Sequence, residues 1–129
     1  MTVLVQEFIE ESEGRDVRVI VVGPRAVAAM RRQARLGEFR SNVHRGGAAT
    51  ALDLPHDLAQ AAVRACRALR LQVAGVDLLE SKRGPKVLEV NSSPGLEGIE
   101  NATKIDVASA IVEYAVAFGR RAARRRRAV

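Results

Sequence analysis

VAGVDLLESKRGPKVLEVN, residues 73–91, consists of two runs rich in valine and leucine on either side of the polar segment SKRGP at 81–85. Apolar runs of this length bounded by glycine and proline are typical of β-strands, and a five-residue connection is typical of a hairpin. If the hairpin is centred on Arg83, Asp77 lies directly opposite Glu89. The segment therefore predicts a pair of carboxylates facing each other on neighbouring antiparallel strands.

Because side chains alternate along a strand, this hairpin has one polar and one apolar face. Asn91 projects from the same face as Asp77 and Glu89. The aliphatic residues of the hairpin form the opposite, core-facing side: Val76, Leu78, Leu88 and Val90. Two like charges about 5 Å apart repel by roughly 3 kcal/mol at an effective dielectric constant of about 20. A hard divalent cation would relieve that repulsion, and Mg²⁺ commonly completes such an oxygen shell with water and substrate phosphates.

A purely structural interpretation of the two acids is also open. One carboxylate could point to solvent while the other pairs with Lys82 or Lys86. The register of the hairpin is itself an assumption, so spacing alone does not decide between the two interpretations.

The regions before the hairpin predict an antiparallel opening, a polar loop and a helix. Residues 3–9 and 16–22 are rich in valine and isoleucine and predict two strands, and residues 26–32 predict a third after a Gly-Pro turn. Residues 55–71 carry leucine and alanine at helical spacing, with Cys66 on the apolar side. After the hairpin, residues 91–98 predict a loop and residues 104–118 a final helix, for which Thr103 and Asp106 form a capping-box pattern. Strands followed by helix, hairpin and helix place the chain in the α+β class.

The loop at 36–47 combines glycines with Arg40 and Arg45 and is too polar for a buried element. Guanidinium groups and the exposed backbone N–H groups of Gly46 and Gly47 would suit phosphate oxygens. An Arg-Gly-Gly segment is equally typical of a flexible connection. The phosphate-binding interpretation gains its support from the acidic hairpin.

Length and composition exclude several other classes of protein. The chain of 129 residues fits one domain. Its longest apolar runs, 26–30 and 114–118, are far shorter than the roughly 20 residues of a membrane helix. The first residues lack the pattern of a secretory signal, and the single cysteine has no partner within the chain. We therefore expect a cytoplasmic protein with no membrane contact.

The net charge of +6 lies entirely in the last ten residues, which contain six arginines. The preceding 119 residues hold 15 basic and 15 acidic side chains. We divide the chain into a lobe at 1–118 and a basic tail at 119–129, which is either disordered or an extension of the last helix. Such a tail is most often a solvated terminus and less often an arm for RNA.

Three motifs resemble the carboxy-terminal part of the RimK-type α-L-glutamate ligases of the ATP-grasp superfamily. They are FRSNVHRGG at 39–47, AGVD at 74–77 and LEVNSSPGLEGIE at 88–100. The resemblance runs from about residue 3 to residue 118 with the motifs in the same order. It implies the carboxy-terminal lobe of an ATP-grasp fold, with a mostly antiparallel sheet and two main helices.

The resemblance also implies a reaction and its participants. A carboxylate takes the γ-phosphoryl group of ATP, and an amine attacks the resulting acyl phosphate to give ADP, phosphate and an amide. In the namesake enzymes the carboxylate is the carboxy terminus of the sixth small-subunit ribosomal protein and the amine is that of glutamate. A second hypothesis is a related ligase that glutamylates a carrier protein or a cofactor instead. A third hypothesis is a non-catalytic fragment that binds nucleotide or RNA. A homo-oligomer is compatible with all three hypotheses.

Site residues follow from the resemblance position by position. Asp77, Glu89 and Asn91 resemble ligands for Mg²⁺ or Mn²⁺, with two ions expected. The residues that match the nucleotide-binding positions are Glu7 and Phe8 of the adenine hinge, Asp16 beyond it, and Arg40, Ser41 and Asn42 of the binding loop. Arg32, Arg40 and Arg45 are the candidates for contact with phosphate or a substrate carboxylate in catalysis.

The lysines of the chain suggest that this site is incomplete. Lys82, Lys86 and Lys104 all come late, so nothing earlier can supply the lysines with which ATP-grasp enzymes hold nucleotide from the preceding lobe. We therefore expect a fragment that lacks the lid and the amino-terminal domain of the family and is poorly active alone.

Overall fold

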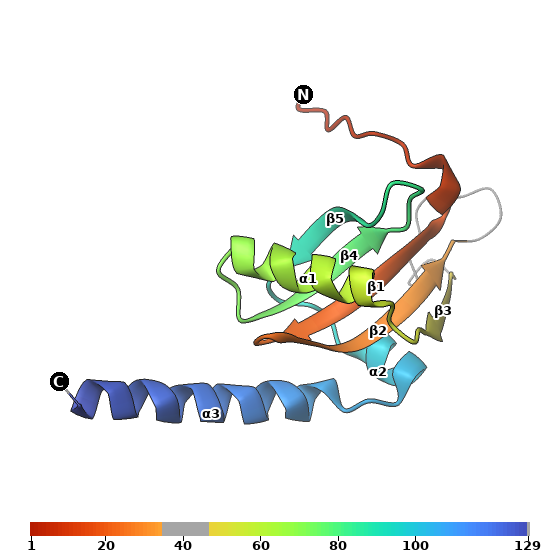
Figure 1. Cartoon of the computed structure of the whole chain (residues 1–129). Coiled ribbons are helices and arrows are strands. Elements are labelled where there is room, and N and C mark those ends of the chain that lie inside the picture. Colours follow the sequence, from red (N-terminus) through yellow and green to blue (C-terminus); the bar gives the residue numbers. More distant parts are fainter. Residues whose placement is uncertain (35–46, 129) are drawn as a thin grey trace.

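The computed structural model describes residues 1–34 and 47–128, and in this part the chain forms one antiparallel sheet with helices on both faces (Figure 1). The sheet has the strand order β3-β2-β1-β4-β5. The strands are β1 (Arg15–Val22), β2 (Arg25–Gln33), β3 (Ala48–Ala51), β4 (Val73–Leu79) and β5 (Lys86–Asn91). The helices are the 3-10 turn η1 (Glu10–Ser12), α1 (His56–Ala68), α2 (Glu97–Thr103) and α3 (Val107–Arg127).

The central strand β1 shows how the sequence shapes both faces of the sheet. Its odd-numbered residues Val17, Val19 and Val21 are buried on the face that α1 covers. The even-numbered residues on the other face change character along the strand, from the charged Asp16 and Arg18 to Ile20 and Val22. Because side chains alternate between faces, one strand supplies a continuous core on one side and a half-polar surface on the other.

The first core lies between the sheet and α1. Leu58, Ala62 and Cys66 recur at helical spacing and pack against valines and leucines of β1 and β4. Burial raises the pKa of the Cys66 thiol, so this cysteine behaves as a small apolar side chain. The prediction of a helix with Cys66 on its buried side is confirmed.

The second core fills only the apolar end of the opposite face. Ile99 of α2 and Val107 of α3 pack there against Ile20, Met30 and their neighbours. Gly23, at φ +59°, lets α3 approach the β1–β2 turn, because a Cβ atom there would lie 2.2 Å from the Tyr114 ring. The polar end of this face, around Asp16 and Arg18, belongs to neither core.

Several sequence expectations need correction at the edges of the fold. Residues 1–9 form no strand, because β1 is already paired with β2 on one side and β4 on the other. The short edge strand β3 lies in a segment for which no element had been expected, and the helix α2 begins inside the loop expected at 91–98. In the hairpin, Asp77 pairs with Glu89 and Val76 with Val90 as predicted, but a bulge after Asp77 pairs Leu78 with Val87. Leu88 is therefore exposed rather than in the core.

The last helix begins later than expected and continues into the tail. Asp106 caps α3 by accepting a 2.9 Å hydrogen bond from the Ser109 backbone N–H, whereas the Thr103 hydroxyl donates to the Ile99 carbonyl oxygen in α2. The helix continues past residue 118 through the arginines to Arg127, so the tail takes the helical one of its two expected forms. It is amphipathic, and no helix in the described ranges combines the length and apolar character needed to cross a membrane.

Candidate functional site

A row of charged residues crosses the uncovered half of the sheet. Arg18 of β1 lies opposite Asp77 of β4, and Asp77 lies opposite Glu89 of β5. Two residues before Arg18 on β1, and on the same face of the sheet, Asp16 lies opposite Arg32 of β2. Because opposed residues share a face, the register alone brings these five side chains, from four strands, onto one surface.

Asp77 is buried and held by two arginines. The Arg18 guanidinium donates from Nε to Oδ1 and from Nη2 to Oδ2, both at 2.7 Å. Nη2 of Arg32 adds a third bond to Oδ2 at 2.9 Å. Such two-pronged pairs are stronger and more directional than a single contact, so the plane of the Asp77 carboxylate is fixed.

Arg32 links the two buried acids. It binds both oxygens of Asp16 at 2.6 Å and also reaches Asp77. Burial alone would lower the pKa of the Arg32 guanidinium, but the hydrogen bonds and charges of the two carboxylates outweigh it and raise that pKa. Arg32 is thus a permanent cation between two anions, and Asp16, Asp77, Arg18 and Arg32 together are neutral.

An open groove of about 880 Å³ runs over this cluster. Its walls bring together residues far apart in sequence: Glu7 and Phe8 from the amino-terminal segment, Asp16, Arg18 and Arg32 from the central strands, and Asp77 and Glu89 from the hairpin. Phe8 is 63% exposed and offers an apolar surface beside the charges. The groove therefore combines an aromatic wall with an acidic and basic floor, which suits an anionic ligand with a flat ring system.

The amino-terminal segment is tied to the hairpin turn. The Ser12 hydroxyl donates to the Glu80 carbonyl oxygen, and a Glu11 carboxylate oxygen accepts from the Lys82 backbone N–H at 2.7 Å. That backbone hydrogen bond lowers the pKa of the Glu11 carboxyl. Glu7 itself pairs with Arg83 at 2.9 Å. These contacts hold the wall that carries Glu7 and Phe8 against the same hairpin that supplies Asp77 and Glu89.

Asn91 lies two residues after Glu89 on β5, opposite Gly75 of β4. Its side-chain oxygen accepts a 2.9 Å hydrogen bond from the Ser93 backbone N–H. A Cβ atom at position 75 would lie 2.8 Å from Cβ of Pro94, so glycine is required where the loop crosses β4. This close crossing fixes the loop next to Asn91.

The donor set is compatible with a divalent cation on the groove side. A carboxylate has about four lone-pair positions, and the three arginine bonds leave one of them open on Oδ1 of Asp77. Glu89 is exposed, and within residues 1–34 and 47–128 its carboxylate accepts no hydrogen bond and forms no ion pair. Among those residues no three His, Cys, Asp or Glu side chains converge on one point, so water or phosphate oxygens would have to complete the shell.

The groove brings together six residues singled out from sequence, namely Glu7, Phe8, Asp16, Arg32, Asp77 and Glu89, whereas Asn91 is not among its lining residues. Arg40, Ser41, Asn42 and Arg45 lie outside the described residues. Sequence reasoning missed Arg18, although Asp16 and Arg18 share one face of a strand whose other face carries Val17, Val19 and Val21. That alternation places Arg18 on the polar face, but its pairing with Asp77 depends on the contact between β1 and β4, which are distant in sequence.

A nucleotide-sized groove over a charged, half-covered antiparallel sheet is the kind of site found in proteins that bind phosphorylated ligands with a metal ion. Residues 1–115 match the family model of the RimK-like ATP-grasp domain, and the chain belongs to this family. It is 61% identical over 112 residues to a probable alpha-L-glutamate ligase of Rhodopirellula baltica, covering 87% of this chain and 28% of that protein. A probable alpha-L-glutamate ligase of Coxiella burnetii is 57% identical over 114 residues, covering 88% of this chain and 38% of that protein.

Solved structures agree with this assignment of the fold. The ATP-grasp ligase PsnB, in complex with a phosphomimetic variant of its minimal precursor, Mg and ADP, superposes with a TM-score of 0.67 at 25% identity. The match covers 87% of this chain and 34% of PsnB. The macrocyclase MdnC of Microcystis aeruginosa, at 16% identity and a TM-score of 0.59, shares the fold alone. The chain spans well under half the length of these relatives.

Proposed function

We propose that this chain contributes the metal-binding and nucleotide-binding part of an ATP-dependent ligase that joins glutamate to a carboxylate. The observation that carries the proposal is the Asp77–Glu89 pair, opposed across two strands at the floor of the groove beside Arg18 and Arg32. Family membership supports the same activity, since the relatives are named as probable glutamate ligases.

In this proposal Glu7 and Phe8 contact the adenine and Asp16 lies toward the ribose and phosphates. Asp77, Glu89 and Asn91 would hold Mg²⁺ or Mn²⁺, as two ions. The ions would supply positive charge to the phosphate oxygens. Arg40, Ser41 and Asn42 belong to the same nucleotide-binding proposal by resemblance.

The chemical step is the transfer of the γ-phosphoryl group from ATP to the acceptor carboxylate. This forms an acyl phosphate and releases ADP. The glutamate amine then attacks the acyl carbon, phosphate leaves, and the amine loses a proton as the amide forms. Phosphoryl transfer requires the protein to position the reactants and to stabilise charge, and it requires no side-chain nucleophile. A site made of acids and arginines fits these requirements. Arg32, Arg40 and Arg45 are proposed to meet the phosphate or the acceptor carboxylate.

The acceptor we propose is the carboxy terminus of the sixth small-subunit ribosomal protein, in the cytoplasm. The support is the SSPGLEGIE sequence that follows Asn91 and its resemblance to the namesake enzymes. A carrier protein or a cofactor tail is the alternative acceptor.

Nucleotide binding provides the direct test. Binding of a fluorescent ADP analogue to the 129-residue chain should increase with Mg²⁺. Replacing Asp77→Asn together with Glu89→Gln should weaken the Mg²⁺-dependent part at least about tenfold. Glu89→Gln alone tests the same point at an exposed position that does not disturb the buried arginine pairs.

Glu80→Gln is the matched control, because Glu80 is an acid at the end of β4 that pairs with Arg31 and does not line the groove. If binding of the ADP analogue does not change with Mg²⁺, or is equally strong in all variants, the metal assignment is wrong. ADP release and glutamate addition to a peptide ending in the ribosomal sequence, followed by mass spectrometry, then test the acceptor.

A further inference from the structure

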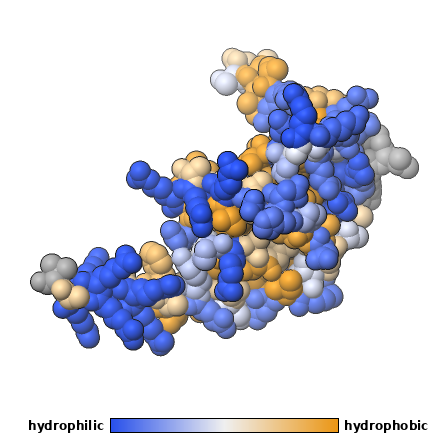
Figure 2. Space-filling view, viewed as in Figure 1, coloured by the Kyte–Doolittle hydropathy of each residue, from blue (hydrophilic) through white to orange (hydrophobic). Residues whose placement is uncertain are grey.

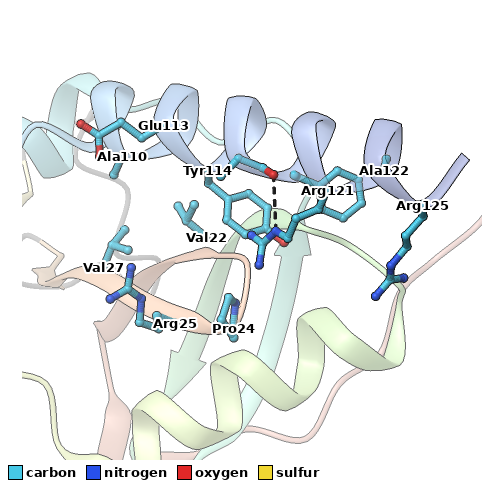
Figure 3. A pocket seen from close by; sticks show the side chains of 12 residues that line it. Val22, Pro24, Arg25, Val27, Ala110, Glu113, Tyr114, Arg121, Ala122 and Arg125 are labelled. Atoms are coloured by element: carbon cyan, nitrogen blue, oxygen red, sulfur yellow. Dashed lines mark hydrogen bonds between the residues drawn. The ribbon is translucent and has the colours of Figure 1, made fainter. Parts of the chain in front are cut away.

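A second groove, of about 850 Å³, lies at the other end of β1, between α3 and the β1–β2 turn (Figure 3). On β1, Arg18 lines the candidate active site and Val22, four positions further along, lines this groove. At about 3.3 Å per residue the two linings are roughly 13 Å apart along the strand. The second groove is therefore a separate feature of the molecule.

The floor of this groove is apolar, and the part next to the hairpin is held in place. Val22, Pro24 and Val27 come from the hairpin, and Tyr114 and Phe118 from α3. The Tyr114 ring lies against Gly23, and its hydroxyl donates to the Gln72 side chain at 2.6 Å. These contacts hold α3 against the hairpin at Tyr114, whereas the turns beyond Phe118 project from the body (Figure 1).

Its rim is cationic. Arg121 and Arg125 reach down from α3, and Arg25 adds a third guanidinium from the hairpin, beside Val27 at the other end of the groove (Figure 3). Glu113 is the one acidic residue in the lining. Within the described part of the chain, none of the three arginines forms an ion pair. An apolar floor with an unneutralised positive rim is complementary to a ligand that carries apolar groups and negative charge together.

The groove extends along several turns of α3. Phe118 is 48% exposed within it, and its lining runs on α3 from Ala110 to Arg125, about 22 Å at 1.5 Å per residue. Figure 2 shows the carboxy-terminal half of α3 as a hydrophilic projection with hydrophobic patches where it joins the body. A small ligand would leave part of this length uncovered, whereas a polypeptide segment would cover it.

We propose that this groove binds an acidic polypeptide segment of a partner protein, with apolar side chains on one face. Arg121 and Arg125 are one helical turn apart, so their charges match carboxylates spaced one turn apart on a facing helix. RNA fits less well, because one face of the Tyr114 ring is occupied and the floor otherwise offers aliphatic groups rather than a stacking platform. The proposal does not rest on the ligase activity, since this groove shares no lining residue with the candidate active site, and Phe118, Arg121 and Arg125 lie beyond residue 115, where the family match ends.

The test is fluorescence anisotropy with a labelled peptide of about 14 residues in which glutamate and leucine alternate at helical spacing. The 129-residue chain should bind this peptide saturably. The double variant Arg121→Gln/Arg125→Gln should weaken binding about tenfold. The control double variant Arg120→Gln/Arg124→Gln removes the same charge at the same spacing from residues that do not line the groove, and should cost less than about threefold.

Two further measurements test the apolar contribution and the competing ligands. Phe118→Ala should weaken peptide binding about fivefold, and an all-glutamate peptide should bind correspondingly less well than the mixed one. Equal losses in the two arginine variants would overturn the proposal by showing a diffuse charge effect. Tighter binding of a single-stranded RNA of similar length, or a dimer in sedimentation velocity that the peptide does not dissociate, would overturn it as well.

Discussion

Asp77 combines two demands that are usually in conflict. Its carboxylate is almost fully buried, yet it must remain charged if it is to bind a cation. Arg18 and Arg32 resolve the conflict by donating three hydrogen bonds to its two oxygens. The same bonds fix the orientation of the Asp77 carboxylate, which lies opposite Glu89 and lines the groove, so in the proposed metal site the two arginines act through Asp77 rather than by contacting the ion.

This arrangement predicts a large cost for removing Arg32. In Arg32→Met, Asp16 and Asp77 lose their shared cation while remaining buried, and the free energy of unfolding should fall by about 3 kcal/mol. Urea denaturation measures the change. Arg31→Met is the control on the neighbouring residue, because the Arg31–Glu80 pair is 38% and 40% exposed and should contribute at most about 1 kcal/mol. Equal losses in the two variants would contradict the role given to the buried cluster.

Gly75 provides a prediction about the loop that follows Asn91. In Gly75→Ala the new methyl group would collide with Pro94, so the loop must shift and stability should fall by about 1–3 kcal/mol. Mg²⁺-nucleotide binding should weaken in parallel because Asn91 lies opposite Gly75. Gly95→Ala is the control, since a Cβ atom there has no neighbour within 4 Å. A variant with unchanged stability and binding would show that the crossing of loop and strand is not constrained.

At the scale of elements, sequence patterns predicted those parts whose partners are close in the chain. The β4–β5 hairpin and α1 follow from local alternation and helical spacing, and with them the opposition of Asp77 and Glu89. The strand expected at residues 3–9 has the right composition, but the strand that follows it in sequence, β1, is already paired on both sides. Conversely, the alanine-rich β3 has little strand propensity and is a strand because β2 offers an edge. Arg18 was missed for the same reason, since its partner comes from a strand distant in sequence.

The cap of α3 gives a pH-dependent prediction. Hydrogen bonds from the Ser109 backbone N–H and hydroxyl lower the pKa of the Asp106 carboxyl below its ordinary value of 3.8. A group with a lowered folded-state pKa stabilises the helix above the unfolded value, and this stabilisation is lost as the pH falls through the folded value. Helicity at 222 nm should therefore decrease below about pH 4. Asp106→Asn keeps a hydrogen-bond acceptor that does not titrate, so the difference in helicity between this variant and the natural chain should shrink in acid. A difference in helicity that stays constant with pH would exclude Asp106 as the source of the pH dependence.

At the scale of the whole molecule, stability is distributed unevenly. The two cores share the sheet, and their largest fully buried side chains come mainly from β1 and β4. By contrast, residues 115–128 of α3 are all exposed, and the helix runs out beyond the sheet (Figure 1). Arginines one turn apart repel each other, although positive charge at the carboxyl end of a helix is favourable to its dipole. The projecting part of α3 is thus the least stabilised helix segment in the described chain.

Hydrogen exchange measures this difference in local stability between the sheet and the end of α3, and it also reports on ligand binding at the second groove. Amides of β1 and β4 should exchange only through global unfolding, whereas amides beyond residue 120 should exchange within about tenfold of the rate in an unstructured peptide. Ending the chain at Phe118 should change the free energy of unfolding by less than about 0.5 kcal/mol, because residues 119–128 are all exposed and belong to neither core. Strong protection at the end of α3 in the free chain would contradict this view. Addition of the acidic peptide should slow exchange near Ala117–Arg125 while leaving β4 unchanged, since an occupied groove stabilises only the helix that forms its wall.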